Sequence, residues 1–243
     1  MLGSYQRFSK RAGDLVGEFF EKPWIDAALG DHKRGGAFCM GATPSYHPFV
    51  MMNYTGKLND ALTLAHELGH GLHDRLASKQ TIFDYHPPLT LAETASVFGE
   101  TLTFDRIMAE ERDPAIRLSM LCDQVEGAFA TVFRQVSMNR FENAVHTRRR
   151  TEGELSPEQL GEIWQEVLQP MFGDSLELTE DHKPWWSYVG HFYFAPGYVY
   201  AYACGNLLAL SVYRPYHEPG PPFVSRYLEF LAAGGSARRA VRV

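Results

Sequence analysis

The stretch that decides both the fold and the chemistry is "LTLAHELGHGLH", residues 62–73. It places His66 and His70 four positions apart, with Glu67 directly after the first histidine. On an α-helix, positions four apart lie on one face, so both imidazoles can point at the same ion. Glu67 lies about 100° further round the helix, within reach of a water on that ion. The pattern H-E-x-x-H therefore indicates a zinc site.

An ordinary helix with partly exposed histidines is the alternative, because the pattern fixes only three positions. The surrounding residues favour the metal site. Leucines at helical spacing flank the histidines and predict a helix that packs against a core: Leu62, Leu64, Leu68 and Leu72. Gly69 and Gly71 each cost about 1 kcal/mol relative to alanine inside a helix. Their presence predicts that another backbone, or a substrate, approaches this helix closely.

A catalytic zinc ion usually has three protein ligands, so a third ligand must come from elsewhere in the chain. An extended pattern with a third histidine fails, since His73 and Leu76 stand where it requires glycine and histidine. The segment "LAETASVFGE" offers Glu93. Ser96 and Glu100 share its helical face, as partners that orient the ligands. Spacing alone leaves Glu93 equally compatible with an exposed helix charge.

The rest of the chain predicts a mainly α fold with a small β-ribbon just before the H-E-x-x-H helix. The short apolar runs "AFCM" and "FVMMNY" flank a turn-rich connection and predict the ribbon. Helical spacing predicts helices in five segments: 4–29, 60–76, 90–110, 114–145 and 156–168. "SPEQ" forms a capping box at the start of the last of them. No repeat or linker divides the chain, which predicts a single domain over residues 1–243.

Composition narrows the class of protein and its partners. The chain has 45% hydrophobic residues and a net charge of −6, which predicts a folded protein and argues against a nucleic-acid partner. No apolar run has the length of a signal peptide core or a membrane span, so we expect a cytoplasmic protein without a membrane partner. Cys39, Cys122 and Cys204 are too few and too widely spaced for a disulfide framework. We expect them to be buried thiols.

Several segments, taken in order, resemble the thimet oligopeptidase and oligoendopeptidase F family of zinc metallopeptidases: "FFEKPWIDA", "GGAFCMG", "MMNYTGKLNDALTLAHELGH" and "GHFYFAPGYVYAYACG". The family pattern is H-E-x-G-H-x-x-H, then E-x-x-S on the next helix, and "HELGHGLH" with "ETAS" matches it. The resemblance implies a multi-helix zincin-type catalytic domain. In it His66, His70 and Glu93 bind Zn²⁺, and Glu67 is the general base. His73 has no ligand role, so we expect it to support the ligands or to pack.

The aromatic segment "GHFYFAPGYVYAY" is either a stripe of core residues or part of the site. The resemblance implies that His191 holds the substrate backbone and that Tyr198 donates to the oxyanion. It also implies that Tyr202 binds the substrate. Gly197 stands where the family carries an aromatic residue. The implied reaction is endopeptidase hydrolysis of short peptides, in which Glu67 takes a proton from a zinc-activated water and passes it to the leaving amine.

Members of the resembled family are longer and have a preceding helical half. This predicts that residues 1–243 are the C-terminal catalytic part of a longer architecture. A missing N-terminal half or a second chain is then expected to cover the peptide channel. Three hypotheses stay open: a zinc endopeptidase or its catalytic half, a catalytically incompetent truncated member that acts as a zinc-binding or partner-binding module, and an unstable truncated product.

Overall fold

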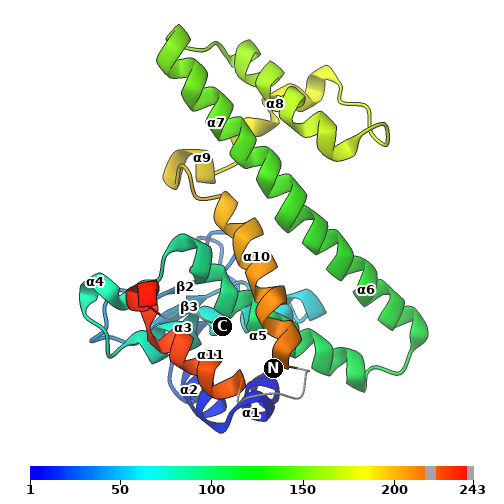
Figure 1. Cartoon of the computed structure of the whole chain (residues 1–243). Helices are drawn as coiled ribbons and strands as arrows, with labels where there is room; N and C mark the ends of the chain where they lie inside the picture. Colours follow the sequence, from blue (N-terminus) through cyan, green and yellow to red (C-terminus); the bar gives the residue numbers. More distant parts are fainter. Residues whose placement is uncertain (217–222, 240–243) are drawn as a thin grey trace. The chain divides into compact units, whose positions relative to one another are not determined.

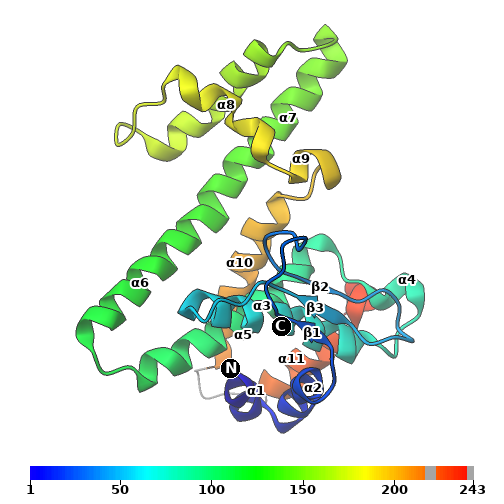
Figure 2. The same ribbon diagram turned by 180° about the vertical axis from the view of Figure 1, so that it is seen from behind.

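The computed structural model describes residues 1–216 and 223–239 and consists mainly of α-helices (Figure 1, Figure 2). The chain forms two compact units. The first unit contains residues 1–120 and 207–243, and the second contains residues 121–206. Each unit has its own apolar core. The predicted mainly helical class is confirmed, whereas the single domain over the whole chain stays a prediction.

Helices of the first unit come from two separated stretches of the chain. The first stretch supplies α1 (Leu2–Phe8), α2 (Lys10–Glu21), α3 (Leu58–Ala77), α4 (Ile82–Tyr85), α5 (Leu89–Glu110) and the start of α6 (Pro114–Phe129). The later stretch supplies the end of α10 (Tyr200–Tyr213), the 3-10 turn η3 (Arg214–Tyr216), α11 (Phe223–Ala232) and the 3-10 segment η4 (Gly234–Arg239). The helices expected at 60–76 and 90–110 correspond to α3 and α5.

A small sheet precedes α3 in the chain. It consists of β1 (Ile25–Asp26), β2 (Phe38–Met40) and β3 (Phe49–Met51), in the order β1-β3-β2. β2 and β3 are antiparallel, with Cys39 opposite Val50, so the predicted ribbon is confirmed. β1 pairs with β3 in parallel. The helix expected at 4–29 was wrong here, because the segment forms α1 and α2, divided at Ser9, and then β1. A strand of two residues is too short to show the alternation from which strands are predicted.

Glycines allow α3 to lie in close contact with its neighbours. A Cβ atom on Gly69 would lie 2.3 Å from the carbonyl oxygen of Ala95 on α5. The predicted close approach of another backbone is therefore confirmed at this position. A Cβ atom on Gly71 would lie 2.6 Å from the ring of Phe19 on α2, so there the close neighbour is a side chain. These contacts fix the distance between α3 and the helices that pack on it.

The core of the first unit lies between α1, α2, α3, α5 and α11. Its buried side chains include Phe8, Val16, Phe19, Leu64, Leu68, Leu72, Phe98, Leu228 and Leu231. Three of the four leucines that the sequence predicted as packing positions on α3 are thus buried. Leu62, the fourth, is half-buried. The histidine-bearing helix is anchored on the core along most of its length.

The second unit has a separate core. It contains the rest of α6, the π-helical segment η1 (Ala130–Arg134), α7 (Gln135–Glu152), α8 (Pro157–Phe172), the 3-10 segment η2 (Glu180–Tyr188), α9 (His191–Phe194) and the start of α10. Its core side chains are Met138, Phe141, Ile163, Trp164, Leu168, Val189 and Val199. The backbone N–H of Gln159 donates to the Ser156 hydroxyl oxygen at 3.3 Å, which confirms the predicted capping box.

Two expectations, one about the helix at 114–145 and one about the three cysteines, were wrong. The helix expected at 114–145 is not regular, because η1 interrupts the α-helical hydrogen bonding. Cys122 and Cys204 are exposed and Cys39 is half-buried, so the thiols are not all in the core. The apolar neighbours Leu121 and Val125, which suggested burial of Cys122, are themselves 46% and 68% exposed.

Among the described residues, no helix combines the length and the apolar character of a membrane span.

Candidate functional site

Three side chains that can bind a metal meet between α3 and α5. His66 and His70 come from successive turns of α3, and Glu93 comes from near the start of α5. Glu93 Oε2 lies 3.2 Å from His66 Nε2 and 3.5 Å from His70 Nε2. One ligand atom from each residue lies within 4.8 Å of the other two. The structure thus brings together the three residues that the resemblance implied as a ligand set.

The spacing of these atoms fits a tetrahedral zinc ion. Zinc bonds to imidazole nitrogen and carboxylate oxygen are about 2.0–2.2 Å long, which puts two donors of a tetrahedral site about 3.4 Å apart. Both measured nitrogen–oxygen separations, 3.2 Å and 3.5 Å, agree with that value. Two imidazoles with one carboxylate are also a donor set typical of catalytic zinc sites. Donor type and donor spacing therefore both suit Zn²⁺.

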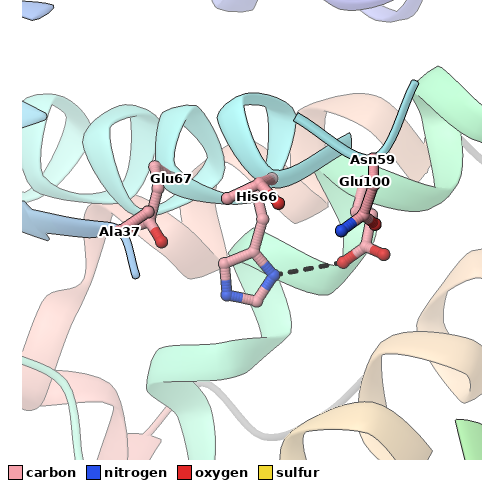
Figure 3. A pocket seen from close by; sticks show the side chains of 6 residues that line it. Ala37, Asn59, His66, Glu67 and Glu100 are labelled. Carbon is pink, nitrogen blue, oxygen red and sulfur yellow. Dashed lines mark hydrogen bonds and ion pairs between the residues drawn. The ribbon is translucent and has the colours of Figure 1, made fainter. Parts of the chain in front are cut away.

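Glu100 contacts the far side of the His66 ring. His66 Nδ1 lies 3.2 Å from Glu100 Oε2, as the dashed line in Figure 3 marks. An Nδ1–H that donates to this carboxylate leaves the Nε2 lone pair for a metal ion. Burial alone would lower the pKa of His66, but hydrogen bonds to Glu100 and Glu93 outweigh it and raise the pKa to about 10. A metal ion must therefore compete with a proton at this ring.

Ser96 contacts the third donor. Its hydroxyl lies 2.9 Å from the backbone oxygen of Glu93 and 3.0 Å from Glu93 Oε2. Burial would raise the pKa of Glu93, but hydrogen bonds to His66 and His70 hold it well below its usual range. Glu93 is therefore a carboxylate at neutral pH. Ser96 and Glu100, which the sequence predicted as orienting partners, each contact one of the three donors.

Glu67 lines a pocket beside these donors. The pocket has a volume of about 260 Å³ and is lined by Ala37, Asn59, Thr63, His66, Glu67 and Glu100. In Figure 3 the Glu67 carboxyl group points to the same side of α3 as the His66 ring. Asn59 and Thr63 were not predicted as site residues. The signal was available, because they precede His66 by seven and three positions and so share its helical face.

The surroundings of Glu67 favour proton uptake. Its side chain is only 6% exposed. Burial raises the pKa of Glu67, although the positive charges of His66 and His70 and the backbone N–H of Cys39 oppose the shift. A carboxylate with a raised pKa is a stronger base at neutral pH than an exposed one. The side chain predicted as the general base thus has the electrostatic setting of one.

His73 is buried and is not one of the three clustered donors. It is 3% exposed. Burial, together with the charges of His70 and His86, lowers the pKa of His73 to about 3. The ring is therefore neutral at physiological pH and packs inside the unit. This agrees with the expectation that His73 is not a ligand.

His191, Tyr198 and Tyr202 lie together in the second unit. His191 begins α9, Tyr198 lies in the turn before α10, and Tyr202 lies in the first turn of α10. His191 Nε2 lies 3.0 Å from the Tyr202 hydroxyl oxygen. The ring centroids of His191 and Tyr198 are 5.8 Å apart, and those of Tyr198 and Tyr202 are 5.2 Å apart. The structure thus groups these three residues in the unit that does not hold the histidine–glutamate cluster.

Comparisons with known proteins give one consistent result. The chain matches the model of peptidase family M3 over residues 8–242. It is 32% identical over 237 residues to Oligopeptidase PepF of Bacillus subtilis, an alignment that covers 97% of this chain and 35% of that protein. It is 33% identical over 217 residues to an Oligoendopeptidase F homolog of Borreliella burgdorferi, covering 88% and 36%. The chain therefore spans about a third of the length of these relatives.

Solved structures share the fold. The crystal structure of oligoendopeptidase-F from Enterococcus faecium aligns with a TM-score of 0.60 at 27% identity, over 74% of this chain and 33% of that one. PZ peptidase A with an inhibitor aligns with a TM-score of 0.81, over 97% of this chain and 42% of that one. Its identity is 18%, so this second likeness concerns the fold alone.

Proposed function

The chain belongs to peptidase family M3, and on that premise we propose that it carries the active site of a zinc-dependent endopeptidase for short peptides. The observation that carries the proposal is the meeting of His66, His70 and Glu93 at the donor spacing of a tetrahedral site. Glu67 lies on the same helix and lines the adjoining pocket. The relatives named oligopeptidase and oligoendopeptidase supply the class of reaction and of substrate.

Glu67 moves the proton in this reaction. The three donors would hold Zn²⁺, which when bound would supply a Lewis acid to polarise the scissile carbonyl and to lower the pKa of a water molecule. Glu67 accepts a proton from that water and then delivers it to the leaving amine. The burial that raises the pKa of Glu67 assists the first of these transfers. Glu100 and Ser96 hold His66 and Glu93 in the orientation that the ion requires.

The aromatic residues of the second unit act on the peptide. Negative charge develops on the carbonyl oxygen in the transition state, and a positioned hydroxyl donor stabilises it. Tyr198 supplies this donor, and His191 hydrogen-bonds the substrate backbone. Tyr202 binds the substrate and, through the 3.0 Å contact between its hydroxyl oxygen and His191 Nε2, holds the imidazole ring. The mutual contacts of the three rings support a joint role.

A further polypeptide belongs to the same proposal. The alignment with the Bacillus subtilis relative covers 97% of this chain but only 35% of that relative. We propose that a polypeptide equivalent to the rest of that relative, in the same protein or as a second chain, completes the channel that holds the peptide. Walls of such a channel would restrict substrates to short, extended peptides.

The test is hydrolysis of a short, internally quenched fluorescent peptide by the purified, zinc-loaded chain. Glu67→Gln removes the base but keeps the size of the side chain, so kcat should fall by about a hundredfold or more. The zinc content, measured by atomic emission, should stay the same. Glu110→Gln, at an exposed position of α5, is the matched control and should leave kcat unchanged.

Other outcomes would lead to different conclusions. Turnover that persists in Glu67→Gln would reject the assigned base. A chain that binds no zinc would reject the metal site. A chain that binds zinc stoichiometrically but turns over no peptide would show that the metal site is intact and that the chain alone is not competent. The reason would be either that it needs the further polypeptide or that it is the second candidate, an incompetent module that retains the metal. That candidate is kept because the chain spans only about a third of its relatives.

A further inference from the structure

Glu142 on α7 is a buried carboxylate that the proposed reaction does not use. Its side chain lies in the core region of the second unit and the residue is 5% exposed. Oε1 accepts a hydrogen bond of 2.7 Å from the backbone N–H of Gly197, 55 positions further along the chain. Oε2 is also buried, and among the described residues it has no hydrogen-bond partner. Burying a carboxylate with one unpaired oxygen costs free energy, so a functional reason for Glu142 is worth seeking.

The hydrogen bond from Gly197 fixes an unusual turn. Gly197 has a φ of +76°, in the left-handed region that residues with side chains rarely adopt. The turn is closed by a hydrogen bond of 3.2 Å from the Tyr198 amide to the Ala195 carbonyl oxygen. It connects the end of α9 to the start of α10. The backbone N–H that donates to Glu142 thus belongs to Gly197, the residue directly before Tyr198, the proposed oxyanion donor.

Val199 anchors the same turn from the other side. Its side chain is fully buried in the core of the second unit, together with Phe141, the neighbour of Glu142. Tyr198 is therefore held between two fixed points, the Gly197 amide and the Val199 side chain. Between them its ring stacks on His191, with an interplanar angle of 14°. A shift of either anchor would move the Tyr198 hydroxyl.

We propose that Glu142 is a positioning residue for Tyr198: its carboxylate holds the Gly197 amide and so fixes the Tyr198 hydroxyl for transition-state stabilisation. This inference rests on the proposed peptidase function. A charged acceptor suits the task, since a hydrogen bond to a carboxylate is about twice as strong as one between neutral groups. Small displacements of a stabilising donor are expensive in rate, about a hundredfold for 1 Å.

Peptide hydrolysis by a set of variants tests the proposal. Glu142→Ala should lower kcat about tenfold or more, with KM and zinc content nearly unchanged. Glu142→Gln keeps an acceptor oxygen and should recover most of the lost rate. Glu152→Ala removes an exposed carboxylate from the same helix and should leave kcat unchanged. Combined with Tyr198→Phe, Glu142→Ala should cost little more than Tyr198→Phe alone, because both remove the same stabilisation.

A purely structural role gives a different result. Glu142→Ala would then lower the melting temperature but leave kcat of the folded enzyme intact, or its effect would multiply with that of Tyr198→Phe. Either result overturns the proposal. Near-ultraviolet circular dichroism checks that each variant is folded. Glu142→Leu, which fills a similar volume but offers no acceptor oxygen, serves if Glu142→Ala does not fold.

Amide hydrogen exchange separates this inference from the proposed function. If the parent chain hydrolyses no peptide, the variants cannot be compared by kcat, but the exchange rate at Gly197 still reports on the anchor. Loss of the hydrogen bond in Glu142→Ala should accelerate exchange at residues 197–199 about tenfold or more, while amides in α8 keep their rates. Equal rates at residues 197–199 in the parent and the variant would overturn the role of Glu142.

Discussion

Glu100 is the residue on which the orientation of His66 depends, because it contacts Nδ1 while Nε2 faces Glu93. Glu100→Gln removes the charged acceptor but retains a hydrogen-bonding amide. We expect the dissociation constant for zinc to rise about 10–100-fold, as is usual when a partner of a ligating histidine is lost. Competition with a chromogenic chelator measures it. Glu110→Gln, on the same helix, is the control, and equal affinities in both variants would contradict the expectation.

His73 gives the first unit a dependence on acid. Its folded-state pKa is lowered to about 3 from the ordinary value of 6.5. Between these values the unfolded chain binds a proton that the folded chain excludes, so the free energy of unfolding falls as the pH drops from 6.5 toward 3. The slope contributed by this one group approaches about 1.4 kcal/mol per pH unit.

His73→Gln checks this dependence. Urea unfolding at a series of pH values gives the slope of the free energy of unfolding against pH. Between pH 3 and 6.5 this slope should correspond to one proton fewer in the variant than in the parent. The comparison cancels the titration of the other groups, including the two histidines proposed as metal ligands. Identical slopes would mean that His73 is accessible to protons in the folded chain.

The three proposed metal ligands differ in how well the sequence predicts them. A spacing of four on a helix is enough to put His66 and His70 on one face. Glu93 lies on another helix, and the spacing of residues along each helix does not predict the distance between the two helices. The spacing left Glu93 equally compatible with an exposed charge, and the resemblance implied it as the third donor. Glu142 was missed because its partner is a backbone amide 55 residues away, which leaves no pattern along the chain.

At the level of secondary structure, the packing of α3 on α5 controls the site. Gly69→Ala would put a Cβ atom 2.3 Å from the Ala95 carbonyl oxygen and 2.6 Å from the Ser96 Cα atom. Both are backbone atoms, so the helices must separate. We expect a loss of about 1–3 kcal/mol in the free energy of unfolding, as for other overpacked sites. Zinc affinity should fall too, because the donors lie on both helices.

Gly127→Ala is the matched control for this substitution. Gly127 lies in α6, and a Cβ atom there meets nothing within 4 Å. The glycine-to-alanine substitution should therefore stabilise the chain here, by up to about 1 kcal/mol from helix propensity. Urea denaturation measures both variants. A Gly69→Ala chain as stable as the parent would show that α3 and α5 adjust without strain.

Helices were easier to predict than the interruptions within them. The apolar spacing and the capping box at Ser156 are local features, and they located α3, α5 and α8. The π-helical segment η1 was missed because an i→i+5 hydrogen bond has no residue preference comparable to a cap. β1 was missed because its two residues pair with a strand that comes much later.

At the level of the whole chain, a metal ion should act on one unit. The proposed zinc donors all lie in the first unit, between α3 and α5. An ion that binds the folded state stabilises it by mass action. Removal of zinc with a chelator should therefore speed hydrogen exchange in α3 and α5 and leave the amides of α7 and α8 unchanged. Equal acceleration in both units would contradict this expectation.

The division into two cores could not be read from the sequence. Helical periodicity shows that a face is apolar but not which other face covers it. The stripes on α7 and α8 therefore look like those on α3 and α5. Only the structure separates the cluster around Trp164 from the cluster around Phe98. The exposed Cys122 and Cys204 show the same limit, since apolar neighbours along the chain do not ensure burial in space.

The discontinuity of the first unit has a consequence for synthesis on the ribosome. Its core includes Tyr227, Leu228 and Leu231 of α11, which are translated after the whole of the second unit. At roughly 5–20 residues per second, the helices that carry His66 and Glu93 wait on the order of 10 s for these partners. The second unit meanwhile emerges as one uninterrupted stretch and can assemble at once. The helices that carry His66 and Glu93 must therefore avoid aggregation until α11 has been synthesised.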